Sequence, residues 1–280
     1  MFYDGYVRKF CPRIIYSVLF FFLFAFPNTA FAEEQISYSR LEETISSLSF
    51  TSIFISTFLL VAFALISLYA SPLRAFSKKL LFILISTVAI GQTLLLAGST
   101  IYVNAISHSG GPVHFHADLE IFHCGTKIDL ENPTGFSNKI GTSTLHEHND
   151  FRIHLEGVVV EENDQSLGKF FHVIGGNITN DSMSVPTTNG MLSLKNGDLC
   201  PDGTPGILNV FLYKTVDKTF IQQKINDPAH YIYASEGQVP SGDCIIIEYG
   251  PDKSSTDKLC TSYQVAESVG KVKNGGKLND

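Results

Sequence analysis

Histidine is concentrated in one part of this chain and repeats there at short spacing. All nine histidines lie beyond residue 106, and two pairs have the pattern His-x-His: His114 with His116, and His146 with His148. His154 follows the second pair by six residues. Residues i and i+2 of a β-strand point to the same side, with α-carbons roughly 6.5–7 Å apart, so both imidazoles of a pair can reach one ion. Two such pairs and a fifth imidazole predict a metal site.

The ligand types indicate which ion this site would hold. Imidazole nitrogen and carboxylate oxygen suit zinc and copper(II), whereas copper(I) carriers prefer thioether ligands. The only methionines beyond residue 106 are Met183 and Met191, so zinc or copper(II) is the predicted cofactor. Three nearby acids could bind the ion directly or orient the imidazoles by hydrogen bonds: Asp118, Glu120 and Glu156.

Two other classes of function stay open. The histidines could be incidental or pH-responsive on a module that binds a protein partner. A metal-dependent hydrolase could use Glu147 or Glu156 as its base, but the chain has no H-E-x-x-H, G-x-S-x-G or phosphate-loop motif. Enzymatic activity is therefore undecided, and a binding function is favoured. We interpret the remaining histidines as structural or linker residues: His108, His123, His172 and His230.

The cysteines beyond the N-terminal region are even in number. They are Cys124, Cys200, Cys244 and Cys260, and they predict two structural disulfides in an oxidising compartment. Three pairings are possible, and the sequence does not choose among them. A thiol–disulfide redox protein is a further alternative, but it would need a C-x-x-C pair, which the chain lacks.

The histidines must be positioned by strands. Polar and apolar residues alternate from His114 to Ile121, which predicts a half-buried strand with Phe115, Ala117, Leu119 and Ile121 on its buried face. Residues 126–130 are a candidate hairpin partner. Asn149 and Asp150 favour a turn between two short strands, and pairing across that turn would set His146 opposite His154.

The rest of the histidine-rich region has a mixed pattern. A short helix is predicted over 167–174, where Gly175 and Gly176 end it. Strands are predicted at 207–213, 218–225 and 245–250. This order predicts an α+β fold, a single mainly-β exported domain over 106–265 with one main helix. The Lys-, Gly- and Asn-rich segment 266–280 is expected to be a disordered tail.

The N-terminal region carries targeting and membrane signals. Basic residues precede the short apolar run 14–26, and a small-x-small site ends at Ala32, which predicts a signal peptide over 1–32. An uncleaved first membrane helix remains the alternative reading. The segment 33–105 then contains two charge-free runs, about 50–70 and about 80–102, each long enough to span a membrane.

The basic residues between the two spans predict their orientation. Arg74, Lys78 and Lys79 lie in this short connection, and positively charged loops remain in the cytoplasm. The segment after residue 106 is therefore expected on the extracytoplasmic side of the cytoplasmic membrane. The spans contain no ionisable side chain that a transport path would use, so the hairpin is predicted to be an anchor in contact with membrane lipid.

Charge separates the two parts of the chain. Residues 1–105 carry a formal net charge of +2, and the remainder carries −9. An acidic domain repels polyanions, so nucleic acid is not an expected partner.

Two resemblances follow from these motifs. The segment from Asn226-Asp227-Pro228 through Gly242-Asp243-Cys244-Ile245-Ile246-Ile247-Glu248-Tyr249-Gly250 resembles the closing segment of β-grasp (ubiquitin-like) domains, where a short turn and a strand finish the sheet. The two His-x-His pairs, with Ile153-His154-Leu155-Glu156, resemble a group of uncharacterised prokaryotic membrane-anchored proteins with such pairs on an exported domain. The resemblance implies export and a histidine site, and it brings no assigned reaction.

Overall fold

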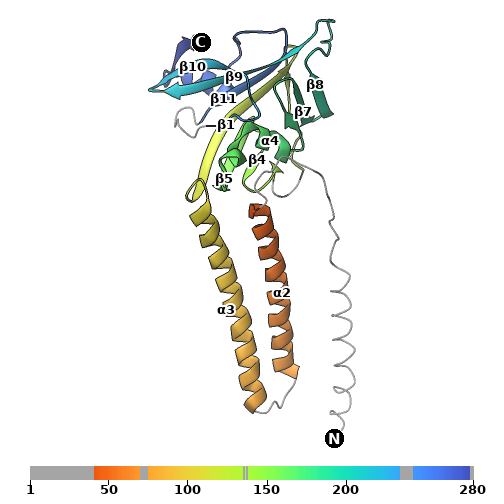
Figure 1. The fold of residues 1–280 in the computed structure, drawn as a ribbon, viewed down its shortest axis with the longest axis vertical. Helices are drawn as coiled ribbons and strands as arrows, with labels where there is room; N and C mark the ends of the chain where they lie inside the picture. Colours follow the sequence, from red (N-terminus) through yellow and green to blue (C-terminus); the bar gives the residue numbers. More distant parts are fainter. Residues whose placement is uncertain (1–40, 70–74, 135, 137, 234–241, 278–280) are drawn as a thin grey trace. The chain divides into compact units, whose positions relative to one another are not determined.

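The computed structural model describes residues 41–277, apart from 70–74, 135, 137 and 234–241 (Figure 1). The expected signal peptide at 1–32 lies outside the described residues. So do residues 71–74 of the connection between the two predicted spans.

Two long apolar helices precede the domain. They are α2 (Leu41–Tyr69) and α3 (Ala75–Ile106), which contact each other. Their segments Thr44–Leu68 and Ser77–Ile106 are long and apolar enough to cross a membrane. Gln92 Nε2 donates a hydrogen bond to Ser52 Oγ at 3.1 Å, which joins the two helices.

The domain is built on a mixed nine-stranded sheet. Its strand order is β12-β10-β9-β11-β1-β5-β4-β3, and β2 pairs with β1 outside this order. The strands are β1 (Pro112–His123), β2 (Thr126–Ile128), β3 (Ile140–Gly141), β4 (Leu145–Glu147), β5 (Arg152–Val158), β9 (Ile207–Val216), β10 (Thr219–Ile225), β11 (Cys244–Gly250) and β12 (Lys273–Lys277). The pairs β1–β11 and β10–β12 are parallel, and the other pairs are antiparallel.

Smaller elements complete the domain and agree with an α+β architecture. A second sheet has the order β6-β7-β8. Its strands and the shorter helices are β6 (Asn177–Ile178), β7 (Ser182–Thr187), β8 (Gly190–Lys195), η1 (Glu162–Gln165), α4 (Leu167–Val173) and α5 (Thr261–Ser268). The helix predicted at 167–174 and the strands predicted at 207–213, 218–225 and 245–250 are confirmed within a few residues.

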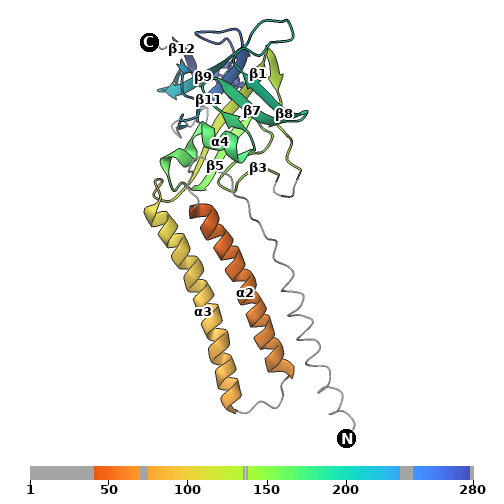
Figure 2. The same ribbon diagram turned by 45° about the vertical axis from the view of Figure 1, so that its right-hand side comes forward.

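The main sheet has an apolar core on each face. One core receives Ala117, Leu119 and Ile121 from β1 and is covered by α4 and the second sheet (Figure 2). The other core lies under α5 and includes Phe122 of β1. Because both faces are covered there, the central strands are apolar on both sides, as Ile245 and Ile246 of β11 illustrate. The predicted half-buried pattern of β1 therefore describes only its first half.

The expectation of a disordered tail over 266–280 needs correction. The chain continues from α5 into β12, which pairs with the edge strand β10. Tyr263 and Ala266 of α5 are buried against the sheet, and Val272 is buried just before β12. Tertiary contacts order residues 266–277, and the Lys-, Gly- and Asn-rich composition does not predict this order.

The structure pairs the four cysteines. Cys124 is bonded to Cys200, and Cys244 is bonded to Cys260. The first disulfide closes a loop of 76 residues and the second one of 16 residues. The Cys244–Cys260 bond attaches the start of α5 to the central strand β11, which explains why α5 remains on the sheet.

Candidate metal centre

Three neighbouring strands and the residue that follows β4 present all five candidate histidines: four lie on the strands, and His148 comes directly after β4. His116 of β1 pairs with His154 of β5, and His154 in turn pairs with His146 of β4. These three imidazoles form a row across the sheet. Two residues before His116 on β1, His114 pairs with Glu156, which is two residues after His154 on β5. The predicted juxtaposition of His146 and His154 across a hairpin is therefore present. We call the set His114, His116, His146, His148, His154 and Glu156 the histidine face.

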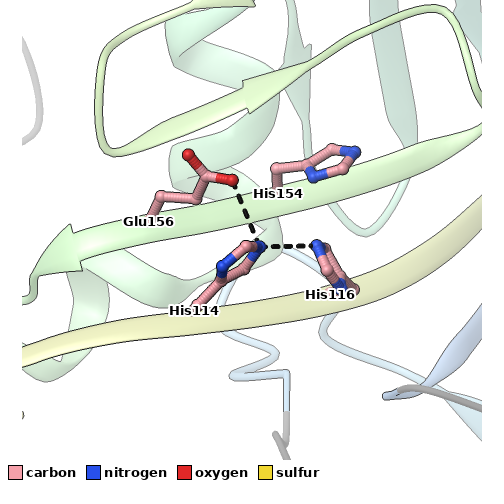
Figure 3. A group of neighbouring side chains, drawn as sticks. All are labelled: His114, His116, His154 and Glu156. Carbon is pink, nitrogen blue, oxygen red and sulfur yellow. Dashed lines mark hydrogen bonds and ion pairs between the residues drawn. The ribbon is translucent and has the colours of Figure 1, made fainter.

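The first group of possible ligands comes from β1 and β5 (Figure 3). The ligand atoms of His114, His116, His154 and Glu156 all lie within 4.8 Å of one another. His114 Nε2 is 3.0 Å from His116 Nε2 and 3.2 Å from Glu156 Oε1. Zinc–nitrogen bonds of 2.0–2.1 Å place tetrahedral ligands about 3.4 Å apart. These two contacts therefore already have approximately the spacing of ligands around one ion.

Hydrogen bonding alone satisfies this group poorly. A neutral imidazole carries one hydrogen on its two ring nitrogens, so His114 Nε2 can donate at most one hydrogen bond. With a hydrogen on Nε2, His114 can donate to either His116 Nε2 or Glu156 Oε1; without it, His114 Nε2 can accept from His116 but then faces the carboxylate oxygen with no hydrogen between them. A metal ion would interact favourably with all three atoms at once.

The second group comes from the β4–β5 hairpin. His146, His148 and His154 also have ligand atoms within 4.8 Å of one another. The ring of His148 is 4.7 Å from that of His146 and 4.8 Å from that of His154, between centroids. His146 is only 1% exposed, and its Nδ1 is buried without a hydrogen-bond partner. A buried polar atom left unpaired is costly, so a ligand at this nitrogen would be stabilising.

The electrostatics keep two of these imidazoles neutral. Burial, followed by the neighbouring charge of His148, lowers the pKa of His146 to about 4. Burial, followed by the charges of His154 and His114, also lowers the pKa of His116. Metal binding requires the unprotonated imidazole. Both side chains are therefore in the ligand form at neutral pH.

A tight turn holds His154 in place. Asp150 Oδ2 lies 3.0 Å from His154 Nε2. The residues on either side of Asp150, Asn149 and Phe151, have φ values of 64° and 58°. Such left-handed conformations are costly for residues other than glycine and concentrate at functional sites. From the sequence Asp150 is expected only as a turn residue, although its position four residues before His154 is a detectable signal.

Two of the predicted accessory acids lie elsewhere. Asp118 Oδ1 accepts a hydrogen bond from Arg152 Nε at 2.8 Å, and Asp118 also contacts Ser262 of α5. Glu120 Oε1 accepts from the backbone of Thr261 at 3.0 Å and forms an ion pair with Lys127. Both acids are on the histidine side of β1, but α5 engages them further along the strand. Glu156 alone of the three joins the histidine groups.

Glu147 does not share the surface of its neighbours. It lies between His146 and His148, and strand alternation turns its side chain to the opposite face. The side chain is 2% exposed, and its Oε1 accepts a hydrogen bond from the backbone of Asp150 at 2.9 Å. Burial raises its pKa to about 7. Glu147 therefore holds the turn at Asp150 by a hydrogen bond on the opposite face of the sheet. It is not placed to act as a base beside the histidines.

The remaining histidines have other contacts. His123 lies beside the ring of Tyr249, and His230 pairs with Asp227 on the surface. Neither belongs to the groups of possible ligands found among the described residues.

Comparisons with known proteins add no assignment. No family model, curated protein or solved structure matches this chain. The function must therefore be argued from the histidine face itself.

Proposed function

We propose that this chain is a membrane-anchored protein that binds zinc or copper(II) on the histidine face, outside the cytoplasm. One observation carries the proposal: three neighbouring strands bring imidazoles and a carboxylate to ligand spacing on one surface. Imidazole with carboxylate is the donor set that suits these two ions.

The proposed location rests on independent features. Two disulfides are typical of proteins in an oxidising compartment. The two long apolar helices suit a bilayer anchor. The basic residues of the connection between them favour a cytoplasmic loop, which would leave the domain on the opposite side.

The side chains of the histidine face differ in exposure, which favours a site that exchanges its ion with solvent over a closed structural site. The side chain of His114 is 63% exposed, whereas that of His146 is almost fully buried. A closed structural zinc site has four protein ligands sealed in the fold. Here the outer part of the face is open to solvent, so an ion could enter and leave from that side.

Metal analysis of the full chain tests the proposal. The protein, purified in detergent, is stripped with a chelator, reloaded separately with zinc and copper(II), and passed through a desalting column before the metal content is measured. We expect stoichiometric metal in the wild type and in His230→Ala. Loss of metal is expected in the double variant His116→Ala/His154→Ala.

The control decides between specific and incidental binding. His230 is an exposed histidine beside a carboxylate, as His114 is, but it lies outside the histidine face. Wild-type protein that retains no metal would refute the proposal. Equal retention in the double variant would show that the ion is held elsewhere.

A further inference from the structure

The histidine face contains more ligands than one ion can use. It offers five imidazoles, and the two carboxylates of Glu156 and Asp150 lie beside them. That makes seven donors, whereas zinc and tetragonal copper(II) sites take four. A single ion would leave three donors unused.

The donors divide into two sets on either side of His154. His114 and His116 lie on β1, whereas His146 lies on β4 and His148 directly follows it. Glu156 lies on β5, with its Oε1 3.2 Å from His114 Nε2 and its Oε2 3.9 Å from His146 Nε2, so its closer contact assigns it to the β1 set. The two flanking strands are separated by β5, so they are roughly 10 Å apart at neighbour spacings of about 4.8 Å. His154 stands on β5 between the two sets and belongs to both groups of possible ligands.

The ring of His154 has a nitrogen available to each side. Its ring is 4.7 Å from that of His116 and 4.8 Å from that of His148, between centroids, and nearly perpendicular to both. In Figure 3 one ring nitrogen lies on the side of His116 and the other points away from it. Nε2 is the nitrogen that Asp150 contacts at 3.0 Å. This distance also suits two ligands of one ion, about 3.4 Å apart in a tetrahedron.

From this arrangement we infer that the histidine face binds two metal ions, with the imidazole of His154 as their shared ligand. The inference rests on the proposed function and extends it. One ion takes His114, His116, Glu156 and His154. The other takes His146, His148, Asp150 and His154. The seven donors then supply two complete sets of four, because His154 is used twice.

Sharing requires one change in protonation. A neutral imidazole coordinates one ion through its free nitrogen and keeps a proton on the other. The second ion binds there only when that proton leaves, and Asp150 is placed to pass it to solvent from Nε2. The second ion is therefore bound with release of one proton from His154.

Copper(II) titration of the full chain in detergent tests the inference. Metal content gives the stoichiometry, and electron paramagnetic resonance gives the coupling between ions. We expect two equivalents in the wild type. The signal should rise with the first equivalent and fall per ion with the second, because two copper(II) spins couple through a shared imidazolate. His230→Ala should behave as the wild type.

Variants assign each ion. His114→Ala and His148→Ala should each bind one equivalent with an uncoupled signal, since each keeps one set intact. His154→Ala should show no coupling at any copper content. Near-ultraviolet circular dichroism shows whether each variant has kept its fold, and His154→Gln offers a second replacement if His154→Ala has not.

The outcomes separate this inference from the proposed function. One equivalent of both zinc and copper(II) in the wild type would overturn the two-ion inference and leave the proposed function standing. No bound metal would overturn both. Two equivalents whose signals stay uncoupled in the wild type would overturn the shared imidazole.

Discussion

His116 and His154 stand directly opposite each other on β1 and β5, with their ring centroids 4.7 Å apart. Paired positions of antiparallel strands have α-carbons only about 4.5–5.5 Å apart, so this contact follows from the register itself. It joins the long strand β1 to the β4–β5 hairpin. Each of the two elements carries one His-x-His pair.

Replacing His154 by Ala should weaken metal binding more than any other single substitution on the histidine face. Loss of a supporting contact outside the ligand set typically costs 10–100-fold in affinity. Loss of a ligand common to both groups should therefore exceed about a hundredfold. Competition with a calibrated chelator measures the dissociation constant. A change as small as that in His230→Ala would show that His154 is not a ligand.

Asp150→Asn should lower metal affinity by at least about 10–100-fold while the fold is retained, since loss of a supporting contact alone has that effect. The substitution preserves the shape of the side chain but removes the charge that faces His154 Nε2 at 3.0 Å. Asp227→Asn is the matched control, because Asp227 makes a similar contact with His230 at 3.0 Å on another surface. Equal effects of the two variants in the same chelator competition would contradict a role for Asp150.

The metal-free protein should show two opposing pH effects. The pKa of His146 is lowered from 6.5 to about 4, so between these values the unfolded chain takes up a proton that the folded chain does not. Acidification through this window destabilises the fold. The pKa of Glu147 is raised from 4.5 to about 7, so here the folded chain takes up the extra proton. Acidification from pH 7 to pH 4.5 therefore stabilises the fold through Glu147.

Single variants should separate these effects. His146→Gln lacks the destabilising His146 contribution, so its melting temperature should rise relative to wild type as the pH falls from 6.5 to about 4. Glu147→Gln lacks the stabilising Glu147 contribution, so its melting temperature should fall relative to wild type as the pH falls from about 7 to 4.5. Circular dichroism in detergent with a chelator present measures both. Parallel pH profiles for all three proteins would contradict the assignment.

Removing the Cys244–Cys260 disulfide should release the C-terminal segment. Its loop of 16 residues corresponds to about 3 kcal/mol of unfolding free energy in the chain-entropy description. We expect Cys244→Ala/Cys260→Ala to increase hydrogen exchange over 261–277, where α5 and β12 lie. Mass spectrometry of the exchanged peptides gives the readout.

The other disulfide provides the comparison. Its loop of 76 residues corresponds to about 4.5 kcal/mol, so Cys124→Ala/Cys200→Ala should be the less stable variant. Exchange over 261–277 should nevertheless remain slow in that variant below its melting temperature. Fast exchange there in both variants would mean that the second disulfide does not hold α5.

Local patterns were enough to predict several elements. The alternation from His114 to Ile121 identified both the strand and its apolar face, because side chains of a strand alternate between faces. The turn at Asn149 and Asp150 identified the hairpin that places His146 opposite His154. These predictions succeeded because period and turn chemistry act over a few residues.

Composition was less reliable where distant contacts decide the structure. Residues 266–280 have the make-up of a disordered tail, yet β12 pairs with β10. Asp118 and Glu120 share a strand face with His114 and His116, yet α5 reaches over and engages them. No local pattern reports what packs on a face from elsewhere in the chain.

The sequence by itself determined that His114 and His116 lie on one strand, that His146 lies on another opposite His154, and that two long apolar helices precede them. Only the tertiary structure decided that β1 and β4 flank β5, which sets the two pairs on either side of His154. It also chose one cysteine pairing out of three. The physical reason is the same in each case: strand order and disulfide partners depend on packing between segments far apart in the chain, whereas strand period depends only on neighbouring residues.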